Sequence, residues 1–370
     1  MVLRKGALLL TAAALVLALA LPAFAGGGTE TAAAGGKIYI PVISKGFQHQ
    51  FWQTVKKGAE AAATKYGVDI TFEGPPTEAD IQAQVQMLVN DLAKNPSAIC
   101  LAALDTNSVM DQLNEAIRRK IPIIGFDSGV PNAPKGSIYA TAATNSYAAA
   151  GLAAEKMFPA IKAKIEAATD SKPVTIVDFN QDATSMSVTS RGKGFRDKMI
   201  ELITTQTKHT KADIKVTGNP AYIASDSPTS GKAIIIDVVV PASPKDTDAA
   251  NSAQAVLNRV KSDNILGIFC SNEGTARATL TASNDGSALP TQYPGLIVIG
   301  FDAGKAQKAA VRNKYFFGAI TQDPYNIGFK AVELAYKAVK GEPVADVDTG
   351  AKFYDSTNMD QPDIAQLLYD

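Results

Sequence analysis

The residues best suited to bind a small molecule lie shortly after short apolar segments of the sequence. They are His49, Phe51, Trp52, Asp127, Asn272, Asp302 and Gln322. Carboxylates and carboxamides each form several hydrogen bonds, and an aromatic ring can cover an apolar surface. This combination suits a neutral polyhydroxylated ligand such as a sugar, which has apolar C–H faces and a rim of hydroxyls. Each buried hydroxyl needs a partner, because an unmet one costs about 1–3 kcal/mol.

These residues also have ordinary structural explanations. The pair Phe51-Trp52 at the start of a predicted helix is more often core packing than ligand stacking. Asp127 followed by Ser and Gly is typical of a turn, and Asn272 is a suitable helix N-cap. Their shared location, one group per strand end, is what favours a binding site.

The elements that must position these residues alternate between strand and helix. The first series has predicted strands at 37–43, 68–72, 98–103 and 121–126, separated by predicted helices at 51–66, 78–92 and 107–118. A similar alternation starts again near residue 137 and runs to a final helix at 324–340. Apolar strands separated by helices predict a parallel sheet covered on both faces. Two such series predict an α/β fold of two doubly wound lobes, with ligands bound beyond the carboxyl ends of the strands.

One segment does not fit this alternation. Between 204 and 246 the sequence has β-rich stretches at 214–217, 222–224 and 233–240, where a single strand would suffice. We therefore expect an extra hairpin or an extended loop there, with no role assigned to it.

The N-terminal segment is typical of a secretory signal peptide. Arg4 and Lys5 precede an apolar run at 7–21, and Pro22 is followed by the small-residue site Ala23-Phe24-Ala25. The run is shorter than the roughly 20 residues of a membrane-spanning helix. We expect cleavage after Ala25, a flexible tether at 26–36 and export to the periplasm.

Composition excludes several classes of function. The chain has 370 residues, which favours two domains, and it carries 36 basic and 36 acidic residues. A near-neutral chain lacks the positive field that holds a nucleic acid. Two histidines and two cysteines leave little material for a catalytic zinc or a Ser-His-Asp site. We therefore expect a protein that is not an enzyme, with no cofactor, no metal and no nucleic-acid partner.

The surroundings of the two cysteines and two histidines in the sequence indicate whether each side chain is buried. Cys100 and Cys270 lie in apolar strands of different predicted lobes, so we expect two buried free thiols. His49 is expected to hydrogen-bond in the wall of the cleft rather than bind a metal. His209 lies in a Lys/Thr-rich segment and is expected to be solvated.

With these residues identified, the chain resembles the periplasmic sugar-binding proteins of ABC importers, of the ribose- and galactose-binding type (periplasmic binding protein type I). The resemblance runs from about Lys37 to the C-terminus. It rests on Phe51-Trp52 and on the segments IPIIGFD at 121–127, RGKGF at 191–195, FCSNE at 269–273, VIGFD at 298–302 and GAITQDP at 318–324.

The resemblance implies two lobes joined by three crossing segments, with hinges near 141–145, 321–323 and 351–354. The N-terminal lobe would comprise 37–143 and 323–352, and the C-terminal lobe 144–322 and 353–370.

The resemblance also implies site residues. His49, Phe51, Trp52, Asp127, Asn272, Asp302 and Gln322 would line the sugar site. Ser128 and Thr189 stand where ribose binders have arginines, and we include both in the predicted site. The loss of two cationic donors favours a monosaccharide other than ribose, or a polyol. Arg191 either compensates for them or is a surface helix charge, and the surface charge is the expectation.

The function implied is that of a monomeric receptor that delivers a monosaccharide or polyol to the membrane permease of an ABC importer. One alternative is a periplasmic sensor that presents bound sugar to a chemoreceptor or a histidine kinase. A repressor is disfavoured by the signal peptide and by the lack of a helix-turn-helix before Lys37. A hydrolase with Asp127 and Asp302 as paired carboxylates is disfavoured because tight enclosure of the sugar leaves no path for water.

Overall fold

The structure is a computed structural model that describes residues 37–47 and 49–369. The expected signal peptide, its cleavage after Ala25 and the tether lie outside the described residues. Within this part of the chain, no helix is long and apolar enough to cross a bilayer.

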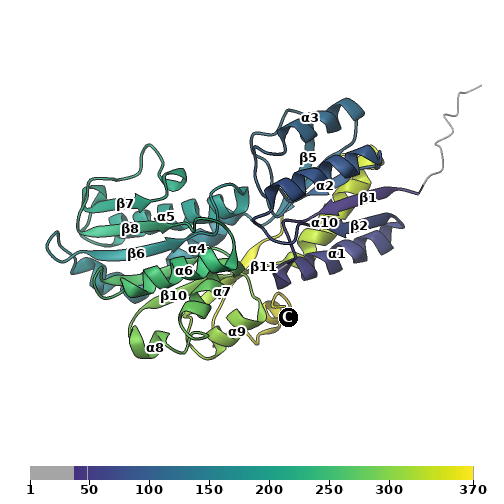
Figure 1. Cartoon of the computed structure of the whole chain (residues 1–370). Helices are drawn as coiled ribbons and strands as arrows, with labels where there is room; N and C mark the ends of the chain where they lie inside the picture. The colour runs from purple at the N-terminus through teal and green to yellow at the C-terminus, as the bar shows by residue number, and fades with distance from the viewer. Residues whose placement is uncertain (1–36, 48, 370) are drawn as a thin grey trace, which may run out of the picture. The chain divides into compact units, whose positions relative to one another are not determined.

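The first lobe is built on a six-stranded parallel sheet with the strand order β12-β5-β4-β3-β1-β2. Its strands are β1 (Tyr39–Ile43), β2 (Asp69–Glu73), β3 (Ile99–Leu101), β4 (Ile123–Phe126), β5 (Ile138–Ala143) and β12 (Val347–Asp348). Helices α1 (Gln50–Tyr66) and α10 (Pro324–Val339) lie side by side on one face of this sheet (Figure 1). Helices α2 (Ile81–Ala93) and α3 (Met110–Arg119) cover the other.

Successive strand residues feed two separate cores, because neighbouring side chains of a strand point to opposite faces. Val42 packs into the core beneath α1 and α10, whereas Ile43 packs against α2 and α3. The inner strands β1, β3 and β4 therefore need apolar residues at consecutive positions, which is the pattern seen in the sequence.

The second lobe has a seven-stranded sheet with the order β13-β11-β10-β9-β6-β8-β7, in which only β13 is antiparallel to its neighbour. Its strands are β6 (Val174–Phe179), β7 (Ile214–Gly218), β8 (Ile234–Val239), β9 (Ile265–Cys270), β10 (Ile297–Phe301), β11 (Gly318–Gln322) and β13 (Ala351–Tyr354). Helices α4 (Ser146–Glu166) and α5 (Met186–Gln206) cover one face. Helices α6 (Asp246–Asn258), α7 (Glu273–Ala282) and α9 (Lys305–Arg312) cover the other.

The short elements α8 (Leu289–Gln292), α11 (Pro362–Ala365), η1 (Lys211–Asp213) and η2 (Pro220–Tyr222) complete the second lobe. The predicted fold class, two doubly wound α/β lobes, is confirmed. The chain passes between the two sheets after β5, after β11 and between β12 and β13. The lobe boundaries and hinge positions expected from the sequence stay predictions.

Of the two alternatives expected between 204 and 246, the hairpin is wrong, and the extended loop is present at 219–233. Strands β7 and β8 are neighbours in the sheet but run parallel, with Ile214 opposite Ile234. The chain leaves β7 through η2, where buried Tyr222 packs beneath α5 and its hydroxyl donates to the carbonyl of Asp182 at 2.5 Å. After this contact the chain returns through residues 223–233 to the other end of the sheet, so that β8 runs in the same direction as β7.

Two expectations on single residues have opposite outcomes. Cys100 and Cys270 are buried free thiols, as predicted. His209 is not solvated: its side chain is buried and its Nε2 lies 2.9 Å from the carbonyl oxygen of Ile165. The polar segment that carries His209 folds back against the end of α4, which composition alone does not show.

Two glycines bring α1 and α10 into close contact. A Cβ atom added at Gly58 would lie 1.9 Å from the carbonyl oxygen of Tyr325, and one added at Gly328 would lie 1.9 Å from that of Val55. Because these neighbours are backbone atoms, only a shift of the helices would make room. The helix that carries Phe51 and Trp52 is thus held against α10 along its length.

We predict that Gly328→Ala lowers the free energy of unfolding by about 1–3 kcal/mol, because overpacking forces the two helices apart. Urea denaturation measures the change. Gly151→Ala in α4 is the matched control, since its added Cβ meets its first neighbour at an ordinary 3.6 Å. The control should be neutral or stabilising by up to about 1 kcal/mol. Equal stability of the two variants would contradict the packing described.

Candidate functional site

A small cavity of about 20 Å³ lies between the lobes and is lined by residues of both. Among the predicted site residues, its lining includes His49, Phe51, Trp52, Asp127, Asn272, Asp302 and Gln322. The lining also includes four charged residues that were not among the predicted ones: Lys45, Glu78, Arg191 and Glu273. The cavity is therefore much richer in charge than the sequence indicated.

The two aspartates occupy equivalent places in the two lobes. Asp127 ends the motif Gly125-Phe126-Asp127 after β4, and Asp302 ends Gly300-Phe301-Asp302 after β10. Both aspartates adopt a left-handed backbone, with φ of 53° and 78°. Asp tolerates this region better than most residues. The turn directs each carboxylate into the cavity at the carboxyl end of its sheet.

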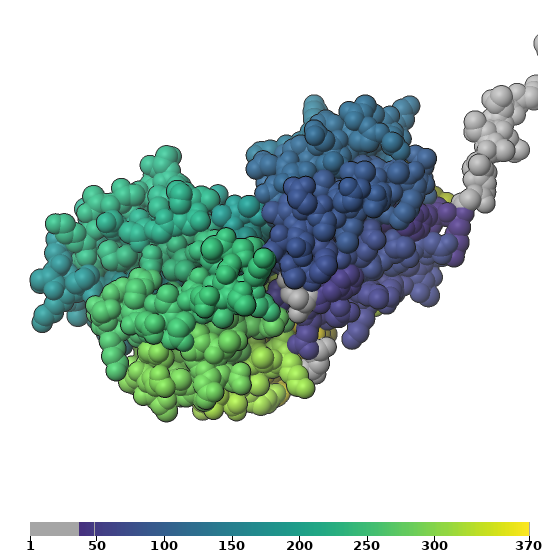
Figure 2. Space-filling view, in the orientation of Figure 1, coloured from purple at the N-terminus to yellow at the C-terminus, as the bar shows by residue number. Residues whose placement is uncertain are grey.

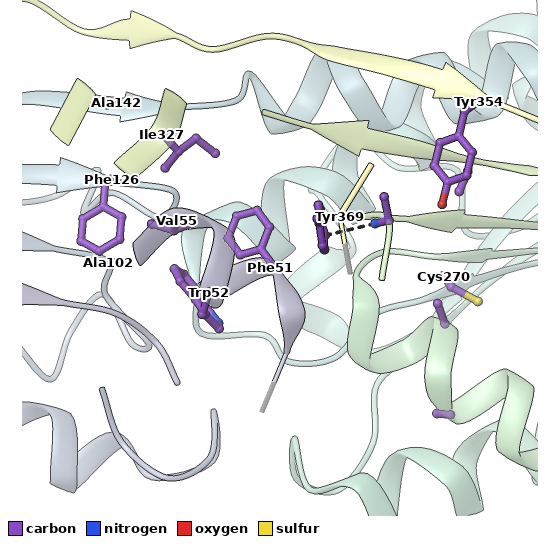
Figure 3. Close-up of a cluster of buried hydrophobic side chains, with 14 of the residues drawn as sticks. Phe51, Trp52, Val55, Ala102, Phe126, Ala142, Cys270, Ile327, Tyr354 and Tyr369 are labelled. Atoms are coloured by element: carbon purple, nitrogen blue, oxygen red, sulfur yellow. Dashed lines mark hydrogen bonds between the residues drawn. The ribbon is translucent and has the colours of Figure 1, made fainter. Parts of the chain in front are cut away.

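Trp52 is fixed at the start of α1 by contacts on several sides. Its ring packs edge-on against Phe51 and Phe126, at centroid distances of 4.9 and 6.3 Å. Its indole N–H donates to the Glu78 carboxylate at 2.8 Å. Figure 3 shows Trp52 and Phe51 at the end of the helix, with Val55 further along it. The ring thus serves both the core and the cavity wall.

Glu78 joins the two lobes. Besides the Trp52 indole, it accepts a hydrogen bond of 2.6 Å from the Gln181 side chain of the second lobe, which in turn accepts one of 2.7 Å from Asn272. Burial acts to raise the pKa of Glu78, but His49, Lys45 and these hydrogen bonds outweigh it and hold the pKa below its ordinary value. The carboxylate is therefore an ionised anchor on the seam between the lobes.

Lys45 is a buried cation in the same seam. Its Nζ lies 3.2 Å from the Asp127 carboxylate and donates to the Ser187 hydroxyl at 3.1 Å. It also lies 5.8 Å from the centre of the Trp52 ring. Burial acts to lower the pKa of Lys45, but Asp127 and Glu78 together raise it above its usual value. The ammonium group is therefore charged at neutral pH.

The expectation that Arg191 is a surface charge is wrong. Its side chain is 3% exposed, and its guanidinium lies 3.9 Å from the centre of the Phe301 ring. It donates to the carbonyl of Ser271 at 3.1 Å and lies 3.9 Å from both Asp127 and Asp302. Helix α5 begins at Met186, so that Arg191 lies in its second turn on the inward face.

Two predicted site residues do not reach the cavity. The Ser128 hydroxyl accepts a hydrogen bond from the backbone N–H of Ser187 at 3.3 Å. The Thr189 hydroxyl donates within α5 to the carbonyl of Ser185 at 2.9 Å. Both hydroxyls are used inside the protein, and neither residue lines the cavity.

Several polar atoms of the cavity residues are buried without a hydrogen-bond partner among the described residues. They are both ring nitrogens of His49, Nε of Arg191 and Oε1 of Gln322; Oδ2 of Asp127 accepts no hydrogen bond but lies 3.2 Å from the Lys45 ammonium. His49 is 3% exposed, and Nε2 comes no closer than 3.7 Å to Glu78. Buried polar groups are nearly always paired in proteins, so a cluster of unpaired ones indicates atoms reserved for a ligand. This polar lining suits a small molecule with hydroxyls around its rim, for which the cavity of about 20 Å³ would have to widen.

The carboxylates of the second lobe are positioned by the protein itself. Asp302 accepts hydrogen bonds from the Gln322 side chain at 2.7 Å and from the backbone N–H of Glu273 at 3.0 Å. Glu273 faces the first N–H groups of α1, at 3.4 Å for Gln50 and 3.5 Å for Phe51. Burial raises the pKa of both carboxyls. The charge of Arg191 acts to lower the pKa of Asp302, and that of His49 acts to lower the pKa of Glu273, but burial outweighs both.

Two of the cavity residues that were not predicted also lie shortly after a strand, as the predicted ones do. Lys45 lies two residues after β1, and Glu78 lies in the loop after β2. A search for charged residues after every strand would have found both. Arg191 lies inside a helix, and no comparable signal singles it out.

Comparisons with known proteins agree on one family. The family model described as "Periplasmic binding protein domain" matches residues 40–343. The D-allose-binding periplasmic protein of Escherichia coli (strain K12) is 22% identical over 321 residues, which cover 84% of this chain and 88% of that protein.

Solved structures give the same result. The ABC transporter, LacI family transcriptional regulator from Brachyspira murdochii is 42% identical with a TM-score of 0.73, covering 90% of this chain and 99% of that one. An ABC transporter solute-binding protein from Agrobacterium vitis with bound D-fucose is 27% identical with a TM-score of 0.71, covering 90% and 100%.

The carboxyl of Asp178 is buried just before the Asn180–Gln181 loop, and we expect it to make the stability of the protein depend on pH. Burial raises the pKa of Asp178 to about 8, against an ordinary value of 3.8. The folded state therefore binds this proton more tightly than the unfolded state, and its stability falls as pH rises from about 4 to 8. We predict that Asp178→Asn removes this loss and raises the unfolding free energy by a few kcal/mol at pH 9, with little gain at pH 4.

Urea denaturation from pH 4 to 9 measures this effect. Exposed Asp170→Asn is the control, which should follow the unsubstituted protein at every pH. Parallel curves for the unsubstituted protein and Asp178→Asn across that range would contradict a buried, protonated carboxyl.

Proposed function

This chain belongs to the family of periplasmic binding protein domains, and from that premise we propose that it is the solute-binding receptor of an ABC importer for a monosaccharide or related polyol. The observation that carries the proposal is the set of unpaired polar atoms contributed to one cavity by two lobes. A ring of hydroxyls would pair with all of them at once.

The charges of the cavity favour a neutral ligand. Lys45 lies 3.2 Å from Asp127, and Arg191 lies 3.9 Å from Asp127 and Asp302. Each cation is thus already matched by a carboxylate, and an acidic ligand would find no uncompensated positive charge.

The positions of the cations support a sugar other than ribose. The arginines implied by the resemblance at positions 128 and 189 are replaced by Ser and Thr. Lys45 and Arg191 supply cationic donors from other places in the fold, so we expect the preferred arrangement of hydroxyls to differ as well. His49, Phe51, Trp52, Asp127, Asn272, Asp302 and Gln322 would contact the ligand, together with Lys45 and Arg191.

We propose that the ligand stabilises the closed lobes by population shift, and that a permease recognises the closed form. A sensor that presents the closed form to a chemoreceptor or kinase is the second candidate, because the same closure would serve both partners. The name of the Brachyspira murdochii structure combines a transporter with a transcriptional regulator. The signal-peptide pattern at 1–25 favours export, and therefore transport or sensing, over regulation of transcription.

The carboxylates offer little support for hydrolysis. A glycosidase needs one carboxyl as acid and another as base or nucleophile. Glu78 and Asp302 each accept two hydrogen bonds from the protein, and Asp127 is paired with Lys45. We therefore propose a binding protein without catalytic activity.

We predict that at least one sugar in a panel of D-allose, D-ribose, D-fucose, D-arabinose, D-tagatose and common polyols raises the melting temperature. Binding to the native state alone stabilises it by about 2.7 kcal/mol when the ligand concentration is 100 times Kd. Differential scanning fluorimetry measures the shift. Cleavage of the sugar during incubation would favour a hydrolase, and a panel without any shift would contradict the proposed ligand class.

We predict that Asp127→Asn weakens binding of the most stabilising sugar by roughly 10- to 150-fold, the value of one hydrogen bond to a charged group. Isothermal titration calorimetry measures Kd. Asp91→Asn is the matched control, because Asp91 is equally buried but pairs with Lys94 on α2. Equal weakening by both variants would mean that Asp127 acts through stability rather than through contact with the sugar.

A further inference from the structure

Tyr369 lies buried in the seam between the lobes, behind the cavity. Its ring packs edge-on against Phe51 of α1, with centroids 6.4 Å apart and an interplanar angle of 66°. Its hydroxyl accepts a hydrogen bond of 3.0 Å from the backbone N–H of Ala303 in the second lobe. Figure 3 shows both contacts, with the hydrogen bond as a dashed line. Tyr369 therefore contacts Phe51, which lines the cavity from the first lobe, and Ala303, which follows the cavity residue Asp302 of the second lobe.

The Ala303 contact supports an unusual turn. Asp302 has a left-handed backbone with φ of 78°, a conformation that persists when its surroundings hold it. The Asp302 carbonyl accepts hydrogen bonds from the Tyr354 hydroxyl at 3.0 Å and from the Gln307 side chain at 2.5 Å. Tyr369 accepts from the N–H of the same peptide group, so both polar groups of the Asp302–Ala303 peptide are held by side chains.

The segment before Tyr369 is attached to the second lobe. The carbonyl of Leu367 accepts a hydrogen bond of 3.0 Å from the Thr321 hydroxyl of β11. The Tyr369 ring therefore travels with the second lobe, and its contact with Phe51 exists only while the lobes are closed. Figure 2 shows the atoms of the two lobes meeting along this seam, and hydrogen bonds such as Gln181 to Glu78 cross it.

We propose that Tyr369 is a positioning residue for the binding site, which fixes the Asp302 turn and supports Phe51 when the lobes close. This inference rests on the proposed function, because it assigns Tyr369 a role in presenting Phe51 and Asp302 to the ligand. A residue that only fills the core would change stability without changing closure or ligand release.

Trp52 provides a readout that needs no ligand. It is the only tryptophan of the chain, is 1% exposed and lines the cavity. Opening of the lobes exposes the cavity wall, so acrylamide quenching of its fluorescence reports the open fraction of the folded protein. We expect Tyr369→Phe to raise the quenching constant, since the open–closed equilibrium shifts by roughly 2- to 12-fold when one neutral hydrogen bond is lost. Tyr369→Ala, which also loses the Phe51 contact, should raise it further.

Tyr66→Phe is the matched control. The Tyr66 hydroxyl donates to Glu333 at 2.8 Å between α1 and α10, within the first lobe. This variant also loses one hydrogen bond of a tyrosine hydroxyl, here to a carboxylate, without touching the seam, so its quenching should equal that of the unsubstituted protein.

A second measurement is the dissociation rate of D-allose, or of D-fucose if D-allose does not bind, by stopped-flow fluorescence. Tyr369→Phe should release the sugar faster by roughly the same 2- to 12-fold factor. If neither sugar binds, the release rate is measured with the sugar of the melting-temperature panel that stabilises the protein most. If no compound of that panel binds, the proposed ligand class fails while the quenching still tests Tyr369. Unchanged quenching in Tyr369→Phe, with a melting temperature lowered as in Tyr66→Phe, would overturn the proposal and leave Tyr369 a packing residue. Circular dichroism confirms that each variant is folded.

Discussion

The cavity depends on polar atoms that are buried and that the protein does not pair. Each such atom costs about 1–3 kcal/mol, and His49 and Arg191 alone contribute three of them. The neighbouring carboxylates do not pair with these atoms, because they accept hydrogen bonds from other side chains. Glu78 accepts from Trp52 and Gln181, and Asp302 accepts from Gln322. A ligand that supplies the missing partners therefore gains their interaction energy.

This arrangement couples binding to the relation between the lobes. His49 and Asp127 belong to the first lobe, whereas Arg191 and Gln322 belong to the second, so neither lobe alone presents the full set. The seam around the cavity is itself polar, with Lys45 bound to Ser187 and Glu78 to Gln181. Under the proposed closure, contacts of this kind would exchange with water when the lobes separate, so a modest ligand-binding energy would select the closed state.

The sequence allowed the fold and a large part of the cavity to be predicted, because both follow local rules. Consecutive apolar residues in each strand indicated two covered parallel sheets, and residues after strand ends included Asp127 and Asp302. Arg191 could not be assigned in this way, since its place depends on where α5 begins and on a stack against Phe301. His209 and the parallel pairing of β8 with β7 likewise depend on contacts between distant segments, at Ile165 and at Asp182.

The most direct test is a crystal structure of the protein with the sugar that stabilises it most. One sugar ring should occupy the interlobe cavity, with its hydroxyls within hydrogen-bond distance, about 2.7–3.2 Å, of the His49 ring, the Asp127 carboxylate and Nε of Arg191. The ring nitrogens of His49 and Nε of Arg191 would then have the hydrogen-bond partners that they lack within the protein. A sugar bound elsewhere, or a cavity in which these atoms pair with protein groups instead, would contradict the account.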